Sequence, residues 1–240
     1  MRETAETPEP LPGRPEPNHP GAKQPGTKQP GIKQPGMKQQ GPGESGILRA
    51  AIAVMTEHGY HGTSVRDIAM RAGISPAALY YHFESKQEVL ATIMERGIEA
   101  LLRASRAALA AAGDEPAAGL GALVETHVLF HLRDQRGTML GTSELRALDE
   151  PVRGRHIAKR HRQQRLFDGV ITRGVEQGAF TTPIPLEASR AIVVMCTGVA
   201  AWFSPDGPLD RTEIARNYRR LALDMVAARP ARAPDLTERS

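Results

Sequence analysis

The chain has few of the residues that several common protein classes need. Its 240 residues include one cysteine, Cys196, so no disulfide can form within the chain, and this fits a reducing compartment. No apolar segment near the N-terminus precedes a cleavage site, which argues against a secretory signal. The longest apolar run, Ala191 to Phe203, has thirteen residues and is too short to span a bilayer. We therefore expect a cytoplasmic protein with no membrane partner.

Motifs for catalysis and metal binding are also missing. The chain has no Gly-rich phosphate loop and no Cys-His pair at a useful spacing. His127 and His131 are four residues apart and could form a metal pair on one helical face, but no third ligand is obvious. Two core or pocket histidines are the favoured interpretation. We predict that the protein is not an enzyme and that it has no metal and no cofactor.

The charge balance gives little direct support for a nucleic-acid partner. The net charge of +4 permits such a partner without demanding it. Residues 44–93 hold four basic and five acidic side chains. Residues 1–43 hold six basic and four acidic side chains, and residues 94–240 hold twenty-one basic and eighteen acidic ones, so only residues 44–93 are not net basic. Any case for DNA binding near residues 44–93 must therefore rest on geometry.

The N-terminal residues 1–43 are predicted to be disordered. They are rich in proline and glycine and contain the repeat GAKQP, GTKQP, GIKQP, GMKQQ, with too little apolar surface to offset the entropy of ordering. Each repeat carries one lysine. Two interpretations stay open, a dispensable solubilising tail and a cationic tether that touches phosphates. We also expect residues 229–240 to be disordered, because Pro230 ends the last helical pattern.

From Ser45 onward the pattern predicts an all-α fold of about nine helices, with no strand-like alternation and no Asn-Gly hairpin. The first helix ends at Gly59, and the fourth extends to Gly113. Later helices begin at Pro116, over the short segment SELRAL and at Pro151. An apolar helix then ends at Trp202 and Phe203, and the last helix begins with a capping box of Asp210 and Glu213.

Three helix starts follow each other between residues 64 and 88. Ser64 and Asp67 have the spacing of a capping box, and Gly73 ends that helix. Ser75 is a good N-cap before Pro76 at the first helical position, and Ser85 caps the fourth helix with Glu88 as its box partner. The two short helices joined by RAGIS have the dimensions of a helix-turn-helix.

The run Tyr80, Tyr81, His82, Phe83 is unusual in a chain with only four tyrosines. Leu79 and Phe83 are four apart and should pack inward, so Tyr81 and the flanking rings turn outward. Hydroxyls and imidazole can donate to phosphates, and alanine methyls can touch thymine methyls. The alternative is an ordinary helical corner with exposed tyrosines.

Ile47 to Met94, ILRAAIAVMTEHGYHGTSVRDIAMRAGISPAALYYHFESKQEVLATIM, resembles the N-terminal domain of the TetR family of one-component repressors. The matching motifs are a helix ending in Gly-Tyr, then GTSVRDIA, AGIS, LYYHF and SKQEVL. The resemblance implies an all-helical homodimer that binds double-stranded operator DNA through this domain and a small-molecule effector through a divergent C-terminal domain. By motif position, the implied DNA contacts are Thr63, Ser64, Ser75, Ala77, Tyr80, Tyr81, His82 and Lys86. Met55 departs from the phenylalanine common in the family, which affects packing only.

The domain assignment follows from this resemblance. Residues 1–43 form the tail, 44–104 the helix-turn-helix domain, 105–228 the ligand-binding and dimerisation domain, and 229–240 a second tail. We expect the last two helices to pair with those of a second copy. Gly198, Ala200 and Ala201 would allow close approach, and Ile214, Leu221 and Met225 would supply apolar area.

The effector is predicted from two weaker signals. The segment AAWFSPDGPLDRTEIARNYRRLAL resembles the C-terminal part of a TetR subgroup that includes sensors of acyl-CoA thioesters. The run RGRHIAKRHRQQR has six basic residues and no acid, which suits coenzyme A phosphates, although a solvated helix face would look the same. The candidate ligand-binding residues are His127, Phe130, His131, Arg153, Arg160, Trp202 and Phe203.

The leading functional hypothesis is a repressor that a small hydrophobic or acyl-CoA-type ligand releases from DNA. The alternatives are a TetR-type regulator of an efflux or drug-response operon, an activator of the same fold, and a non-enzymatic helical ligand-binding protein.

Overall fold

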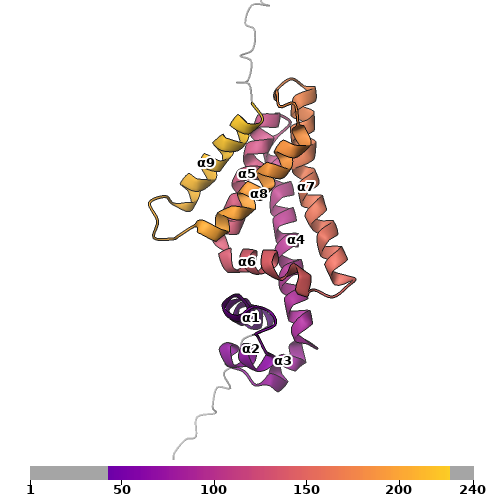
Figure 1. Ribbon diagram of the computed structural model, residues 1–240, viewed down its shortest axis with the longest axis vertical. Coiled ribbons are helices and arrows are strands. Elements are labelled where there is room, and N and C mark those ends of the chain that lie inside the picture. Colours follow the sequence, from indigo (N-terminus) through magenta and orange to yellow (C-terminus); the bar gives the residue numbers. More distant parts are fainter. Residues whose placement is uncertain (1–42, 228–240) are drawn as a thin grey trace, which may run out of the picture. The chain divides into compact units, whose positions relative to one another are not determined.

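The computed structural model describes residues 43–227 (Figure 1). The predictions for both tails therefore fall almost wholly outside the described residues. Over residues 43–227 the chain forms helices and no strand, which confirms the all-α fold class. The helices are α1 (Glu44–His58), α2 (Val65–Ala72), α3 (Pro76–His82), α4 (Lys86–Ala112), α5 (Pro116–Arg133), α6 (Gln135–Ser143), the 3-10 helix η1 (Glu144–Ala147), α7 (Val152–Glu176), α8 (Pro185–Trp202) and α9 (Arg211–Met225).

Local capping chemistry sets most helix starts, as predicted. The Ser64 hydroxyl accepts from the Asp67 backbone N–H at 3.2 Å, and the Asp67 carboxylate accepts from the Ser64 N–H at 2.8 Å. Gly73 ends α2 with φ 70° and ψ 31°, a left-handed conformation that glycine adopts without steric cost. The Ser75 hydroxyl caps α3 by accepting from the Ala78 N–H at 3.1 Å. These bonds make the turn between α2 and α3 a property of the local sequence.

Two local predictions were wrong. The helix predicted over SELRAL is only the 3-10 helix Glu144–Ala147, and the longer helix α6 precedes it. The α6 segment QRGTMLGTS has two glycines and little apolar periodicity, so its signal was weak. The Glu88 carboxylate accepts from the Glu84 N–H at 2.6 Å instead of closing a box with Ser85, although the Ser85 hydroxyl does cap α4.

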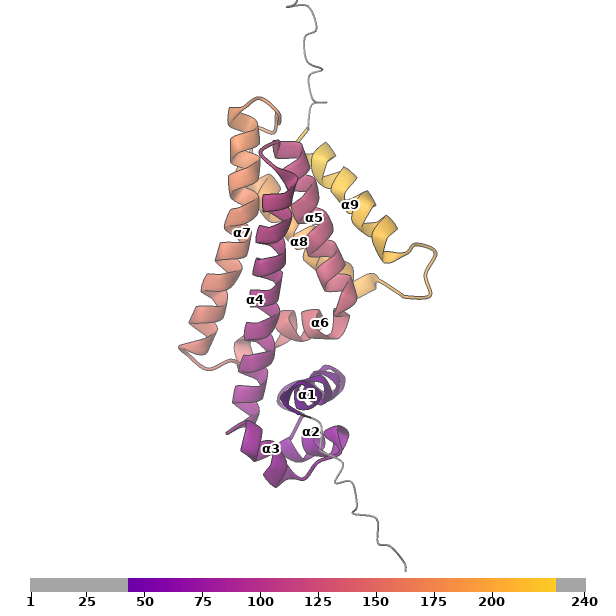
Figure 2. The same cartoon turned by 180° about the vertical axis from the view of Figure 1, so that it is seen from behind.

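The first of two hydrophobic cores lies under α1, α2 and α3. Leu79 and Phe83 enter it from the segment that carries the tyrosines, and the first turns of α4 close it. Leu140 of α6 and Leu148, which follows η1, are buried in the same core. In Figures 1 and 2, α6 lies beside α1, so α6 joins the helix-turn-helix region to the helices that follow.

The second core is built by α5, α7, α8 and α9. Its largest buried rings are Phe167 and Phe180. Phe180 lies against Gly174 so closely that a Cβ at that position would be 2.2 Å from the ring. Gly174 is therefore needed for the chain to fold back after α7. Of the residues expected at a dimer interface, Ala200 and Ile214 are buried within the single chain, Ile214 as a member of this core.

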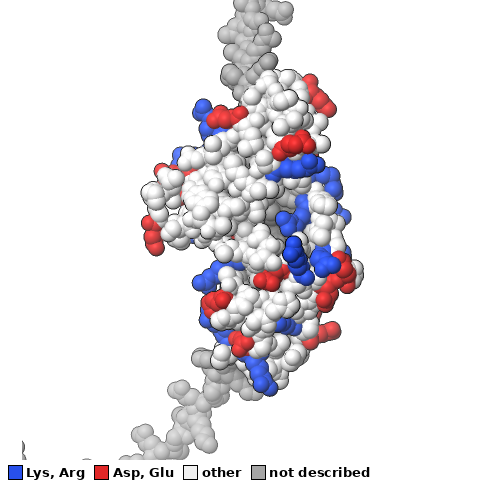
Figure 3. Space-filling model, in the orientation of Figure 1, with Lys and Arg blue, Asp and Glu red and all other residues white. Residues whose placement is uncertain are grey.

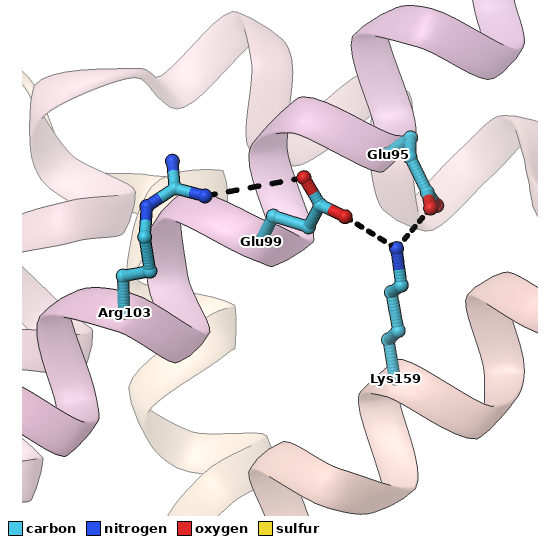
Figure 4. Close-up of polar contacts among 4 residues, drawn as sticks. All are labelled: Glu95, Glu99, Arg103 and Lys159. Carbon is cyan, nitrogen blue, oxygen red and sulfur yellow. Dashed lines mark hydrogen bonds and ion pairs between the residues drawn. The ribbon is translucent and has the colours of Figure 1, made fainter.

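Helix α4 continues without a break from the first core to the second. Its early residues Val89 and Leu90 are buried in the first core, and its later turns contact α5 and α7. The domain boundary proposed between residues 104 and 105 thus falls inside one helix. An ion-pair cluster fastens α4 to α7, since Lys159 Nζ contacts both Glu95 and Glu99, the latter at 2.6 Å (Figure 4). The hydrogen bond from Lys159 lowers the pKa of the Glu99 carboxyl.

Among residues 43–227, none of the helices combines the length and the apolar character that a membrane-spanning segment needs.

Cys196 should be unreactive in the folded protein. Its side chain is fully buried in the second core, and burial raises the pKa of the thiol to about 12. Because the thiolate is the reactive form, we expect a colorimetric disulfide reagent to label one thiol per chain in denaturant and none in native buffer at mildly alkaline pH. Rapid labelling of the native protein would contradict the burial of Cys196.

Candidate functional site

The helix-turn-helix presents one polar, ring-bearing surface. Leu79 and Phe83 are buried as predicted, whereas Tyr80 is 54% exposed and Tyr81 is 87% exposed. Ala77 and His82 are exposed on the same short helix. The Tyr81 and His82 rings meet edge to face, with centroids 5.3 Å apart. Four successive rings are thus divided between the core and a surface with several hydrogen-bonding groups.

The remaining four predicted DNA-contacting residues differ in their accessibility. Ser64 and Ser75 are exposed at the N-terminal ends of α2 and α3. Thr63 is 2% exposed, and its hydroxyl donates to the Gly59 carbonyl at 2.8 Å. Its side chain therefore lies inside and not on the predicted surface.

Lys86 is also used within the chain. Its ammonium group donates to the Tyr60 carbonyl at 2.8 Å and the Thr63 carbonyl at 2.6 Å, and it lies 4.1 Å from the centre of the Tyr60 ring. Two of its three N–H donors are therefore occupied, and its evident role is to hold the α1–α2 connection against the start of α4. The sequence motif gave no sign of this role.

A cavity of about 550 Å³ lies between the two cores, with mostly apolar walls. Six helices contribute to it: α1, α4, α5, α6, α7 and α8. Four of the candidate ligand residues line it, namely His127, Phe130, His131 and Arg160. Leu48 and Ile52 of α1 are also in the wall, so the cavity reaches the helix-turn-helix region directly.

Three candidate ligand residues lie outside this cavity. Arg153 is held by Glu150, with 2.8 Å between the guanidinium Nε and the carboxylate. Trp202 is 55% exposed and stacks on Tyr218, with 6.3 Å between ring centres. Phe203 is buried in the second core. Each is therefore occupied by packing or by an ion pair away from the cavity.

The basic run on α7 is partly neutralised by acids from elsewhere in the chain. Basic side chains gather along the α7 side of the face shown in Figure 3. Lys159 is paired with Glu95 and Glu99 of α4, and Arg153 with Glu150. Arg160 has no ion-pair partner among residues 43–227 and lines the cavity. The sequence run alone could not show which cations are paired, because most of the acids are distant in sequence.

His127 is held in a hydrogen-bond network inside the cavity wall. Its Nε2 lies 3.0 Å from the Thr197 hydroxyl, which itself donates to the Val193 carbonyl at 2.9 Å. Since the Thr197 proton is used there, His127 Nε2 must carry the proton and donate. His127 Nδ1 then accepts from the Gln163 amide at 3.4 Å. Burial lowers the pKa of His127 well below its usual value, so the ring is neutral.

His131 is the second neutral histidine. Its Nδ1 lies 2.8 Å from the Thr138 hydroxyl, and its ring centre lies 4.6 Å from that of His127. Burial, with a smaller contribution from the Arg160 charge, lowers the pKa of His131 to about 4. Within residues 43–227, no group of three His, Cys, Asp or Glu side chains is placed to hold a metal ion.

Sequence reasoning missed several residues of the cavity. His156 and Gln163 line it from α7 together with Arg160, and their spacing of four and then three residues places all three on one helical face. That spacing is a signal that could have identified them. Thr138, which also lines the cavity, carried no comparable signal, and neither did Ser105, which lies outside the cavity wall and accepts from the Gln163 amide at 2.8 Å.

Comparison with known proteins decides the family. The family profile described as bacterial regulatory proteins, tetR family, matches residues 47–93, and that of the tetracycline repressor-like C-terminal domain matches residues 113–226. The crystal structure of the TetR-family regulator PfmR from Thermus thermophilus is 35% identical, covers 74% of this chain and 97% of its own, and has a TM-score of 0.69. The chain belongs to the TetR family of transcriptional regulators.

Other relatives agree with this membership. The HTH-type transcriptional repressor KstR2 of Rhodococcus jostii (strain RHA1) is 29% identical over 184 residues, which is 76% of this chain and 90% of KstR2. A tetR-family regulatory protein from Rhodococcus RHA1 is 29% identical, covers 78% of this chain and 98% of its own, and has a TM-score of 0.73. The TetR-family chain described here is thus a DNA-binding transcriptional regulator.

The stability of this TetR-family regulator should fall as the pH falls from about 7 to 5. The unfolded chain binds a proton at His131 near its ordinary pKa of about 6.5, whereas the folded chain does so only near pH 4, so acid favours unfolding. His131 alone should lower the free energy of unfolding by roughly 2 kcal/mol over that interval. His127 acts in the same direction.

The measurement is urea unfolding at several pH values for the wild type and His131→Gln. The variant should show a flatter dependence on pH, while the exposed-site control His61→Gln should keep the wild-type slope. Parallel slopes for the wild type and His131→Gln would show that His131 does not titrate as its burial requires.

Proposed function

We propose that this protein is a homodimeric repressor that binds operator DNA through α3 and dissociates when a lipophilic, acyl-CoA-type effector occupies the cavity. The observation that carries the proposal is the cavity itself. It has the volume of a small-molecule site, and its wall includes helices of both cores.

The DNA-binding part rests on the exposed groups of the helix-turn-helix. We assign phosphate or base contacts to Ser64, Ser75, Ala77, Tyr80, Tyr81 and His82, all of which are exposed. Lys86 has one N–H donor left for a phosphate, and Thr63 is removed from the set because its side chain is buried. The tyrosine and serine hydroxyls can donate to phosphates without adding a cation. This suits a domain whose charge is not basic.

The dimeric state is supported by an apolar face on α8 and α9. Val194 is 71% exposed, Leu221 51% and Met225 40%. Gly198 lies on the same face of α8 as Val194, with open space around it. Exposed apolar side chains around a small residue suit close packing against the same face of a second copy. Two such copies would present their α3 helices to half-sites about 34–36 Å apart.

The acyl-CoA part is supported by charge and by relatives. Arg133 and Arg160 line the cavity, are exposed, and have no ion-pair partner among residues 43–227. Asp134 also lines it, but its carboxylate is occupied in capping α6. Two exposed cations beside an apolar cavity suit an apolar acyl group with an anionic head.

A protein of this fold has been crystallised with both a coenzyme A ester and DNA. AibR, which shares the fold at 22% identity with a TM-score of 0.67, was crystallised with isovaleryl coenzyme A and operator DNA. The fatty acid metabolism regulator protein of Bacillus subtilis is 21% identical over 185 residues, which is 75% of this chain and 93% of its own. AibR supports the choice of acyl-CoAs as the first ligands to test, and the Bacillus subtilis protein supports an effector connected with fatty acid metabolism.

The position of the cavity supports the proposed release of DNA by the effector. Leu48 and Ile52 of α1 and Ile93 and Met94 of α4 belong to the wall and also pack in or against the first core. A ligand that fits one arrangement of these helices better than another shifts the population toward it. A shift that changes the spacing of the two α3 helices in the dimer weakens DNA binding.

Replacing both exposed tyrosines should abolish tight DNA binding without unfolding the protein. We expect Tyr80→Ala/Tyr81→Ala to lose about 3 kcal/mol, or roughly 100-fold in affinity, because two hydrogen bonds to charged phosphates are removed. Fluorescence anisotropy with a DNA fragment from upstream of the gene measures the loss, and circular dichroism and size exclusion check fold and dimer.

The phenylalanine pair Tyr80→Phe/Tyr81→Phe separates the hydroxyls from the rings. The control Met139→Ala alters a 45% exposed side chain on α6, far from α3 in sequence, and should bind normally. Undiminished affinity of the folded, dimeric double alanine variant would refute the assigned DNA surface.

Acyl-CoAs should bind the cavity and release DNA. We expect calorimetry to detect binding for a range of chain lengths, and anisotropy to show dissociation of the DNA complex on their addition. Arg133→Gln/Arg160→Gln should weaken acyl-CoA binding at least about tenfold while leaving ligand-free DNA binding intact.

Arg155→Gln is the control, because Arg155 is an exposed cation of α7, the helix that carries Arg160, and lies outside the cavity. If no acyl-CoA of any length binds while DNA binding is intact, the effector class is wrong and the efflux-regulator hypothesis becomes the better one.

A further inference from the structure

Three side chains that line the cavity each carry one buried polar atom with no hydrogen-bond partner: His131 Nε2, His156 Nδ1 and Gln163 Oε1. Their residues are only 8%, 6% and 3% exposed, and all three line the cavity. Within residues 43–227, these are the only buried side-chain nitrogen or oxygen atoms without a partner. Since a buried unpaired polar atom is destabilising, their gathering in one cavity needs an explanation.

The orientation of Gln163 follows from its neighbours. His127 Nδ1 is unprotonated, because its Nε2 donates to Thr197, so it requires a donor. The Gln163 amide nitrogen supplies that donor at 3.4 Å and also donates to Ser105 at 2.8 Å. Both amide hydrogens are therefore used, and Gln163 Oε1 remains as an acceptor without a donor.

The proton of His131 is placed by the same reasoning. The Thr138 hydroxyl lies 2.8 Å from His131 Nδ1 and donates to no other group among residues 43–227. Donation to Nδ1 satisfies this hydroxyl, and on that basis we assign the proton of the neutral ring to Nε2. His131 thus offers an unpaired donor and Gln163 an unpaired acceptor. The His131 ring packs on the His127 ring, and the Gln163 amide is hydrogen-bonded to His127.

We propose that His131 and Gln163 form a subsite for a hydroxyl group on the apolar part of the effector, with His156 as a third polar contact. A hydroxyl matches the chemistry of the two atoms, because it can accept from a donor such as His131 Nε2–H and donate to an acceptor such as Gln163 Oε1. A plain alkyl chain would leave both atoms unpaired and shut off from water, and a ketone would pair only with His131. This inference rests on the proposed function, since it takes the cavity to be the effector site.

The test compares decanoyl-coenzyme A with a set of monohydroxydecanoyl-coenzyme A esters whose hydroxyl stands at successive carbons. Calorimetry on the full chain should find at least one position that binds roughly ten- to a hundredfold more tightly than the unsubstituted ester. The corresponding ketodecanoyl ester should fall between the two. Displacement of DNA should follow the same order.

Two variants assign the preference to these residues. Gln163→Leu removes the acceptor and His131→Leu removes the donor, and each should abolish most of the hydroxyl preference, measured as the ratio of the hydroxylated to the unsubstituted ester's affinity within that variant. Ile98→Val is the matched control, because Ile98 lines the cavity without a polar group and should affect both esters alike. Thermal unfolding checks that each variant is folded, and the wild-type comparison needs no variant at all.

The outcomes are distinct. Equal binding of the plain and hydroxylated esters by the wild type overturns this inference and leaves the proposed acyl-CoA effector intact. Preference for the ketone over every hydroxyl position also overturns it, as does a hydroxyl preference that survives in both Gln163→Leu and His131→Leu. If none of the esters binds, the proposed effector class fails and the inference fails with it.

Discussion

The burial of one continuous helix against two cores is the constraint on which the rest of this structure depends. Helix α4 begins at the Ser85 cap, closes the first core with Val89 and Leu90, and continues past the cavity to contact α5 and α7. Unbroken main-chain hydrogen bonds make such a helix move largely as one body. A shift of the later turns of α4 is therefore passed on to its first turn. The ion pairs of Lys159 with Glu95 and Glu99 hold α4 against α7.

The first turn of α4 is hydrogen-bonded to the connection between α1 and α2 and to η1. Lys86 binds the carbonyls of Tyr60 and Thr63, just before α2. Gln87 accepts from the Tyr60 hydroxyl at 2.6 Å and donates to the Ala147 carbonyl of η1 at 2.9 Å. These contacts, with Leu140 and Leu148 in the first core, join α6 and η1 to the helix-turn-helix. The cavity wall and α3 thus share one continuous core, so a change at the cavity can reach α3 through side-chain packing alone.

The sequence was sufficient for most helix ends, where the deciding interaction is local, although the local Ser85–Glu88 box does not form. The Ser64–Asp67 and Asp210–Glu213 boxes, the Ser75–Pro76 start and the Gly73 stop each depend on atoms within a few residues, so their patterns predict the structure directly. Prediction failed where distant segments decide. Thr63 and Lys86 match a DNA-contact motif, but the fold turns one inward and engages the other with carbonyls. Lys159 of α7 looked unpaired only because its partners, Glu95 and Glu99, lie on α4.

The histidines of the cavity also depend on contacts with segments that are distant in sequence. The spacing of His127 and His131 correctly places them on one face of α5, yet their chemistry is set by Thr197, Thr138 and Gln163 from three other helices. Burial keeps both rings neutral, and the network leaves a donor and an acceptor unpaired, at a cost to stability. A well-packed apolar core would avoid this cost. The polar network in a mostly apolar cavity is explained if a bound effector pairs those two atoms. Binding then removes the cost of the unpaired donor and acceptor. It stabilises the ligand-bound arrangement of the helices more than apolar contact alone could.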